Sequence, residues 1–342
     1  SERSVDANNR VAELLPEAVK CGRDDAWERA RELTRESSPW ELEFFKASLG
    51  ESEVSIGLAK LLAETSISHV VEFETDVHKT DYIDWRTLTY AMIRKGRKPW
   101  RRYLYQVSDR LKFLAGIVVA LPLLVLYLIR HTGKPQQVPE NAQQILAVHA
   151  EWTNRTRHVL GEIGSGLAPD VIIVIGRPQR RLSEVFQTWS ENLGRPLPRI
   201  IVPVSFKTGL VASPEILSQL ARGFQLVGKQ PHIPVLLEIS AIVFRVMLGC
   251  VMRRWWLDCG YKGGEVVYGH TGTADTTMLE LAQQERGTIT THIVHGLSTG
   301  PNFVGFSDKA FFRCGYDANL YANLDQYEAC LWVNVEKPKV HR

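Results

Sequence analysis

The chain has 342 residues, of which 44% are hydrophobic and 23% are charged, and its formal net charge is +3 at pH 7. This composition is that of a globular protein and excludes an intrinsically disordered one. The length allows one large hydrophobic core or two ordinary ones. A net charge so close to zero does not indicate nucleic acid as a partner, and none is expected.

Cysteine usage and the first residues bear on the compartment. The five cysteines are scattered and form no CxxC pair, so they predict neither a disulfide framework nor a zinc site. The opening SERSVDANNR is polar and lacks the apolar stretch of a secretory signal. We therefore expect a reducing, cytoplasmic environment.

Helical periodicity dominates the first part of the chain. In residues 8–67 apolar side chains recur every three or four positions, which predicts helices. Ser38 followed by Pro39 fits a helix start, with the serine as the cap and the proline in the first helical position. A further helix is predicted over 81–102, ending near the proline at position 99. Residues 1–135 are thus predicted to form a largely helical region.

A basic stretch precedes an apolar one within this region. Residues 94–112 hold eight Lys or Arg against one acid, Asp109. Residues 113–129, FLAGIVVALPLLVLYLI, carry no charge, are barely long enough to span a membrane, and have Pro122 in the middle. A buried core helix, a segment kinked in one leaflet and a full span all remain open. The preceding basic and aromatic residues favour peripheral or monotopic contact of 94–130 with the anionic cytoplasmic face of an inner membrane.

From about residue 141 the pattern changes to alternating strands and helices. Residues 170–176 and 199–205 are apolar runs typical of strands buried on both faces of a parallel sheet. Shorter strands are predicted at 265–268 and 290–294. Helices are predicted at 143–160, 181–193, 214–223, 235–257 and 276–286. The predicted fold is α/β, with an open Rossmann-like parallel sheet in residues 141–342 after the helical region.

Ligands of open α/β sheets bind beyond the carboxyl ends of the strands, and the loop GHTGTAD, residues 269–275, occupies such a position before a helix. Its glycines allow close approach to the backbone, and the helix start offers N–H groups to an anion or a sugar hydroxyl. His270 and Asp275 are candidate general bases. Alternatively, Asp275 or Thr276 only caps the helix. The loop is neither a Walker A nor a GxGxxG motif. The candidate substrate-binding residues in it are Gly269, Thr271, Gly272 and Thr273.

Two other loops also follow predicted strands. After the first strand come Arg177, Arg180 and Arg181, whose charges suit the phosphates of a donor or of a lipid diphosphate. After the last comes HGLSTG, residues 295–300, which matches GxSxG around Ser298. A nucleophile elbow requires a helix after the serine and a later acid and histidine. Here PNF follows and little chain remains, so a serine hydrolase is not expected and Ser298 is interpreted as a loop residue at the site.

The remaining histidines and a charged segment give weaker signals. His292 and His295 are three positions apart on a strand and should point to opposite faces, so they do not predict a metal site. No metal or other cofactor is expected, and His292 is expected to pack inside the sheet. Within the predicted helix 143–160, Glu151 and Arg155 would pair on one face, unless Arg155 or Arg157 instead reaches a phosphate.

Taken in order, these features resemble bacterial surface-polysaccharide glycosyltransferases of the GT-B type, including capsule-assembly and polyol-phosphate transferases. The resemblance covers roughly residues 165–320, and its motifs are short. It rests on the strand ending at Gly176, on GHTGTAD before a helix with Leu279-Glu280-Leu281-Ala282, on THIVHG, and on Ser307-Asp308 with Gly315 beyond.

The resemblance implies transfer of a sugar from a nucleotide-activated donor to a lipid-linked or glycan acceptor. His295 would activate the acceptor, or His270 or Asp275 would, with Gly296 allowing close backbone approach and GHTGTAD lining the pocket. GT-B enzymes have two Rossmann-like domains, and one set of strands is visible, so this sequence is expected to hold only the first. The alternative function is a non-catalytic, membrane-associated α/β module that binds a nucleotide, sugar or partner in a polysaccharide assembly complex.

Overall fold

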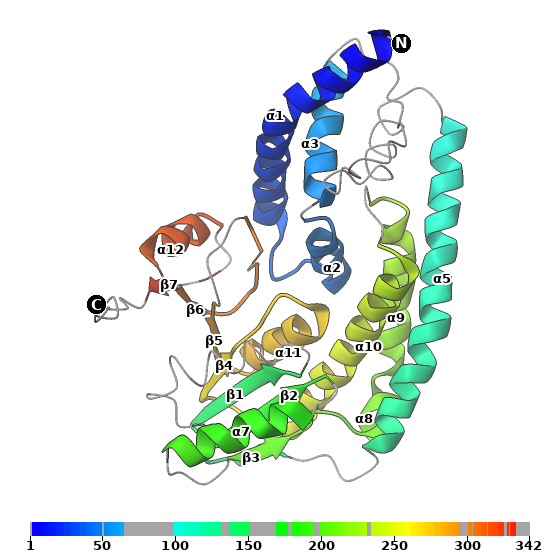
Figure 1. Ribbon diagram of the computed structural model, residues 1–342. Coiled ribbons are helices and arrows are strands. Elements are labelled where there is room, and N and C mark those ends of the chain that lie inside the picture. Colours follow the sequence, from blue (N-terminus) through cyan, green and yellow to red (C-terminus); the bar gives the residue numbers. More distant parts are fainter. Residues whose placement is uncertain are drawn as a thin grey trace.

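The structure is a computed structural model in which helices surround a single sheet (Figure 1). It describes residues 2–49, 51–64, 99–131, 137–150, 169–176, 180–193, 198–230, 234–294, 300–302, 304–312, 314–324, 327 and 329–332. The first helices are α1 (Glu2–Glu32), α2 (Pro39–Ala47) and α3 (Glu51–Glu64). They confirm the helices predicted within residues 8–67.

Helix α2 begins as the sequence predicts. The Ser38 N–H donates to Glu41 Oε2 at 2.6 Å, and Pro39 is the first helical residue. Helices α1 and α3 pack against each other with their backbones close together, because both contribute glycine at the contact. A Cβ added to Gly57 would lie 2.1 Å from the Ala18 carbonyl oxygen, and one added to Gly22 would lie 2.2 Å from that of Glu53.

Helix α5 (Pro99–Arg130) contains the apolar segment. Residues 81–98 lie outside the described residues, but the helix runs on from Pro99 instead of ending there, so that predicted boundary is wrong. Proline is tolerated in a first helical turn, since the N–H it lacks has no partner there anyway. The helix also continues through Pro122, which is exposed.

Seven parallel strands form the sheet in the order β3-β2-β1-β4-β5-β6-β7. The strands are β1 (Gln144–His149), β2 (Val171–Ile175), β3 (Arg199–Ile201), β4 (Glu265–Tyr268), β5 (Ile289–Ile293), β6 (Lys309–Phe312) and β7 (Ala329–Trp332). The predicted α/β class is confirmed. Because the order runs outward in both directions from the centre, the sheet is compatible with a Rossmann-like open sheet.

The helices of this half lie close to their predicted positions. They are α7 (Arg180–Leu193), α8 (Phe206–Val211), α9 (Ser213–Val227), α10 (Leu236–Cys259), α11 (Ala274–Gln284) and α12 (Gly315–Ala322). The four predicted over 181–193, 214–223, 235–257 and 276–286 correspond to α7, α9, α10 and α11, with ends that differ by a few residues. The last two strands and α12 were not predicted, and they extend the sheet beyond β5.

The predicted helix over 143–160 is wrong at its start, where the chain forms β1, an interior strand of the sheet. Residues 145–149 are all buried, because β1 has helices on both faces and strands on both sides. A short, fully apolar run fits helical and strand periodicity equally well, so spacing alone misassigned it. Residues 151–160, with the proposed pair Glu151 and Arg155, lie outside the described residues.

The helices at the start of the chain share hydrophobic cores with the sheet region. Trp40 of α2 and Phe113 of α5 pack edge to face, with ring centroids 5.1 Å apart, and both contact α9 around Gly223. The Trp40 indole N–H also donates to the Gln219 carbonyl at 2.7 Å. A second shared core joins α1 and α2 to α12 and β6. These contacts hold the first helices over the carboxyl edge of the sheet, where the candidate site lies (Figure 1).

Candidate functional site

The centre of the sheet contains the point where ligand sites of open α/β folds usually lie. From β1 the sheet extends through β2 to β3 on one side and through β4 to β7 on the other. At such a switch point the connections leave in opposite directions, which opens a crevice at the carboxyl ends of β1 and β4. The GHTGTAD loop leaves β4 at this position and leads into α11.

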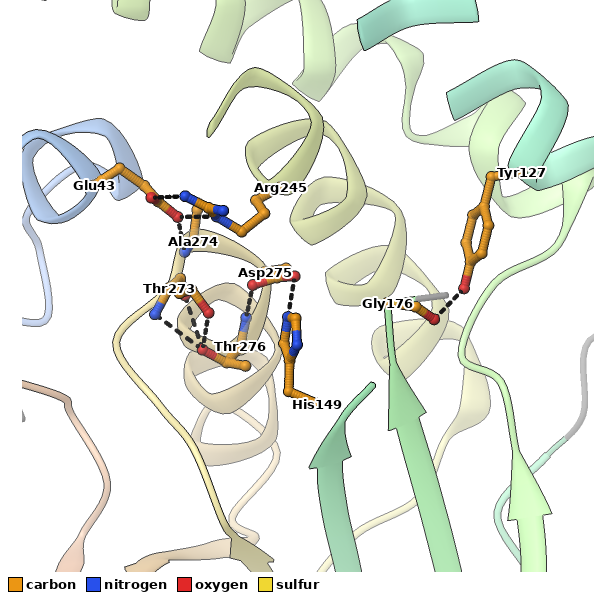
Figure 2. A network of polar contacts seen from close by, with 9 residues as sticks. All are labelled: Glu43, Tyr127, His149, Gly176, Arg245, Thr273, Ala274, Asp275 and Thr276. Carbon is orange, nitrogen blue, oxygen red and sulfur yellow. Dashed lines mark hydrogen bonds and ion pairs between the residues drawn. The ribbon is translucent and has the colours of Figure 1, made fainter. Parts of the chain in front are cut away.

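A buried histidine–aspartate pair lies at this switch point. His149, the last residue of β1, has its Nε2 3.0 Å from Oδ2 of Asp275 in the first turn of α11 (Figure 2). The two side chains are only 1% and 2% exposed. His270, the second loop residue after β4, places its ring edge to face against His149, with centroids 5.7 Å apart. Two histidines and one carboxylate therefore meet where β1 and β4 end.

The environment of Asp275 keeps this carboxyl group ionised. Burial by itself raises the pKa of Asp275, but the charge and hydrogen bond of His149, followed by the charge of Arg245, outweigh burial and hold the pKa below its ordinary value. Its other oxygen, Oδ1, accepts the Thr276 N–H at 2.9 Å. With both oxygens engaged, Asp275 is suited to orient His149 and to stabilise its protonated form.

The start of α11 is closed by the protein itself. Thr273 is the cap, its N–H donates to Thr276 Oγ1 at 3.2 Å, and the two hydroxyls lie 2.9 Å apart. The Ala274 N–H, which the sequence leaves for an anion or a sugar hydroxyl, donates to Glu43 Oε1 at 2.7 Å. The expectation of a free N–H at Ala274 is therefore corrected: the anion there is a carboxylate of α2.

Glu43 also forms a two-pronged ion pair with Arg245 of α10. The two N–H···O distances are 2.9 and 2.7 Å, and the Glu43 carboxylate is almost fully buried (Figure 2). Paired, hydrogen-bonded charges are the form in which carboxylates are tolerated inside proteins. The Glu43 carboxylate thus joins α2, α10 and the first turn of α11.

The other predicted substrate-binding residues of the loop make contacts within the protein. Thr271 Oγ1 lies 3.2 Å from Nδ1 of His292, which is buried as predicted and also lies 3.3 Å from the Tyr327 hydroxyl. Gly272 has a φ of +84°, and a Cβ there would lie 2.2 Å from the Val304 carbonyl oxygen, so this glycine serves the chain's own packing. The Gly269 N–H donates to Ala147 on β1 at 3.4 Å.

The remaining predicted site residues fall mostly on segments that are not described. Arg177, His295, Gly296 and Ser298 lie outside the described residues. Arg180 and Arg181 begin α7, directly beyond the carboxyl end of β2.

The Ser307-Asp308 motif of the resemblance is part of the packing around β5. The Ser307 hydroxyl donates to Glu280 of α11, while Asp308 accepts the Thr290 N–H at 2.8 Å and pairs with Arg35 of the α1–α2 connection at 3.2 Å. In the part of the chain that the structure describes, no three His, Cys, Asp or Glu side chains form a group that could hold a metal ion.

Sequence reasoning missed four contributors to this region: His149, Glu43, Arg245 and Tyr127. Each carried a signal. His149 ends an apolar run. Glu43 stands between Leu42 and Phe44, and Arg245 is the one charge in AIVFRVML, so each is a charge flanked by apolar residues, which is typical of a buried ion pair. Tyr127 of the apolar segment donates from its hydroxyl to the Gly176 carbonyl at 2.8 Å, at the end of β2 (Figure 2).

The site therefore combines an oriented imidazole with a second imidazole at the switch point of a parallel sheet, an arrangement suited to accepting a proton from a bound hydroxyl. At the N-terminus of α11, the Glu43 carboxylate already accepts the Ala274 N–H. The chain matches no model of a known protein family, no curated protein and no solved structure. Its function is therefore inferred from the chemistry of the site.

Proposed function

We propose that the chain is a glycosyltransferase of bacterial surface polysaccharide or glycolipid assembly, acting at the cytoplasmic face of the inner membrane. It would transfer a sugar from a nucleotide-activated donor to a lipid-linked or glycan acceptor, and its sheet would be one Rossmann-like half of a GT-B architecture. The observation that supports this proposal most directly is the His149–Asp275 pair beside His270 at the switch point.

In this proposal an imidazole accepts the proton of the acceptor hydroxyl. The acceptor oxygen then forms a bond to the anomeric carbon, and the bond from that carbon to the donor phosphate oxygen breaks. Because both oxygens of Asp275 are engaged, we assign it the orienting role and the proton to His149 or His270. His295 stays a further candidate for the same role.

The donor phosphates would lie beyond β2. Arg177, Arg180 and Arg181 follow this strand in the sequence, and α7 begins at Arg180, so we assign the donor phosphates to this helix N-terminus and these arginines. The start of α11 is not a phosphate site in this proposal, since Glu43 already accepts its Ala274 N–H.

A second candidate is the non-catalytic binding module of a polysaccharide assembly complex. Two observations favour it. The His149–Asp275 pair is buried, and the Ala274 N–H at the start of α11 already donates to Glu43, so these groups stabilise the fold instead of facing a substrate. This candidate predicts that a nucleotide sugar binds without turnover even when a lipid acceptor is present.

The two candidates are separated by measuring binding and transfer on the same protein. Saturation-transfer NMR against UDP-, GDP-, CMP- and CDP-sugars would identify the donor, and transfer would then be followed with lipid-linked and glycan acceptors. Asp275→Asn should retain donor binding and lower transfer by about 10²-fold or more, the usual contribution of general acid–base catalysis.

The matched control is His292→Gln. It changes a buried histidine on β5, the strand next to β4, and should leave transfer within a few-fold of the unaltered chain. Binding without transfer would favour the binding module. If the chain binds no nucleotide sugar, both the transferase and the nucleotide-sugar-binding module are refuted.

A further inference from the structure

The exposed apolar side chains are concentrated on one group of helices. Of the large apolar side chains that the structure describes as exposed, all but Val19, Ile289, Tyr316 and Leu331 belong to α5, α8, α9 and the start of α10. Representative members are Val118, Leu123 and Leu126 of α5, Leu210 of α8, Leu217 of α9 and Leu237 of α10. An apolar surface of this extent is rare on a soluble monomer and marks a binding surface.

These helices are neighbours, with α5 in contact with the other three. A Cβ on Gly209 of α8 would meet the Leu128 side chain, Phe113 packs against Phe224 of α9 with centroids 6.4 Å apart, and Gly116 abuts Ile239 of α10. In Figure 1, α5 forms one edge of the molecule, and α12 lies on the opposite side. We call the exposed apolar side chains of α5, α8, α9 and residues 235–237 the apolar surface.

Helix α5 is fixed to the protein along its other face. Phe113, Ala120, Leu124 and Leu128 are buried in the main core, and the Tyr127 hydroxyl bonds to Gly176. Residues 106–130 are long and apolar enough to cross a bilayer, and 33% of their most apolar stretch is buried inside the protein. A helix that spans a membrane alone would have to leave this core. A helix with one face in the protein and one apolar face outward is suited to lie in the membrane plane.

Charge around the apolar surface favours an anionic lipid surface. Arg130 at the end of α5 and Lys207 of α8 are exposed. The basic stretch 94–112 precedes the apolar segment 113–129, and its second part forms the first turns of α5. Against them, Glu238 is exposed beside Leu237. A cavity of about 350 Å³ opens at this edge and is lined by Lys207 and Val211, and also by Asp258. Since Asp258 pairs with Arg254 at 2.9 Å, a headgroup drawn to Lys207 has space beside the apolar surface.

We infer that the apolar surface seats the chain in one leaflet of an anionic bilayer, with α5 lying in the membrane plane, and that the acceptor is lipid-linked. The second part rests on the proposed function. It follows from position, since Tyr127 joins α5 to the end of β2, and Gly176 there lies against His149. A substrate anchored in the same leaflet would reach the carboxyl edge of the sheet from the side on which α5 lies.

The test is co-sedimentation of the full chain with vesicles of phosphatidylethanolamine and phosphatidylglycerol, compared with phosphatidylcholine alone. Val118 and Leu237 are 72% and 81% exposed and belong to different helices. Val118→Asp and Leu237→Asp should each weaken binding to the anionic vesicles about tenfold or more, because a charge replaces apolar burial in lipid. Phosphatidylcholine should bind the unaltered chain more weakly.

The control is Tyr316→Asp on α12, a residue 73% exposed and distant from the apolar surface. It adds the same charge and should bind vesicles as the unaltered chain does. Equal binding by all three variants would overturn the inference. So would a dimer in solution that Val118→Asp dissociates without any vesicle binding, which would make the apolar surface an interface between two copies.

Vesicle binding needs no donor, so it is independent of the proposed transfer reaction. If Val118→Asp and Leu237→Asp lose transfer to a lipid-linked acceptor but retain donor binding and transfer to a soluble glycan, both parts of the inference hold. If vesicles bind and no donor does, the membrane surface stands and the proposed function fails.

Discussion

At the scale of single residues, Glu280 of α11 has the most strongly shifted pKa among the carboxyl groups that the structure describes outside the candidate site. Burial, only partly offset by the Ser307 hydrogen bond, raises the pKa of Glu280 from 4.5 to about 7. Between these values the folded chain holds a proton that the unfolded chain has lost, so this group lowers the free energy of unfolding as pH rises. The loss reaches about 3 kcal/mol above pH 7.

Glu280→Gln should therefore remove a pH dependence and stabilise the chain at alkaline pH. The amide keeps an acceptor for Ser307 and never ionises. Urea unfolding should show the variant gaining about 2–3 kcal/mol relative to the unaltered chain between pH 5 and pH 8. Glu285→Gln, at an exposed carboxylate at the end of the same helix, should stay within about 0.5 kcal/mol at either pH. Parallel curves for Glu280→Gln and the unaltered chain would contradict this assignment.

The residues of the site were only partly accessible from the sequence. His270 and Asp275 were identified because they follow a strand and precede a helix, a local pattern. His149 was not, because its partner lies 126 positions away and the pairing depends on β1 lying next to β4. Glu43 was missed for the same reason. The sequence shows that the N–H groups at the start of α11 need an acceptor, but it does not show that a carboxylate of α2 is that acceptor.

At the scale of elements, one carboxylate of α2, that of Glu43, bonds to both α10 and α11. Glu43→Ala would leave Arg245 without its two-pronged partner and the Ala274 N–H without an acceptor. Removing one member of a buried pair is strongly destabilising, and we expect a loss of about 3 kcal/mol in the free energy of unfolding by urea.

The matched control for this loss is Asp258→Ala. It breaks the exposed pair of Asp258 with Arg254 on the same helix α10 and should cost no more than about 0.5 kcal/mol. Equal losses for the two variants would show that Glu43 contributes nothing beyond an ordinary surface pair.

Elements were predictable where local signals agreed. The strands at 265–268 and 290–294 combine β-branched residues with flanking glycines, and α2 has both a serine cap and a proline in its first position. The prediction was wrong at the start of β1, because a strand inside the sheet is buried on both faces and shows no alternation of polar and apolar residues. The strands β6 and β7 were not predicted because their sequences, KAFF and ACLW, contain no β-branched residue.

At the scale of the whole molecule, the boundary predicted near residue 141 divides a helical part from an α/β part. It does not divide the hydrophobic cores, which include residues from both sides of it. Trp40 and Phe113 fill the core above α9, and Phe45 packs with Phe306 and Phe312. A fragment of residues 136–342 would expose these contacts to water. We expect it to lack the cooperative thermal transition of the full chain in circular dichroism. A fragment that melts cooperatively near the full chain's Tm would instead show that residues 136–342 are an independent domain.

The strand order has a consequence for how the chain is made. The interior strand β1 has β4 as a neighbour, and β4 leaves the ribosome only after β2, β3 and helices α7 to α10. Parallel sheets of this kind close by long-range pairing and fold slowly. Helix α5 emerges before α9 and α10, which later cover its buried face. During synthesis residues 113–129 of α5 thus present apolar side chains around the whole helix until α9 and α10 are made.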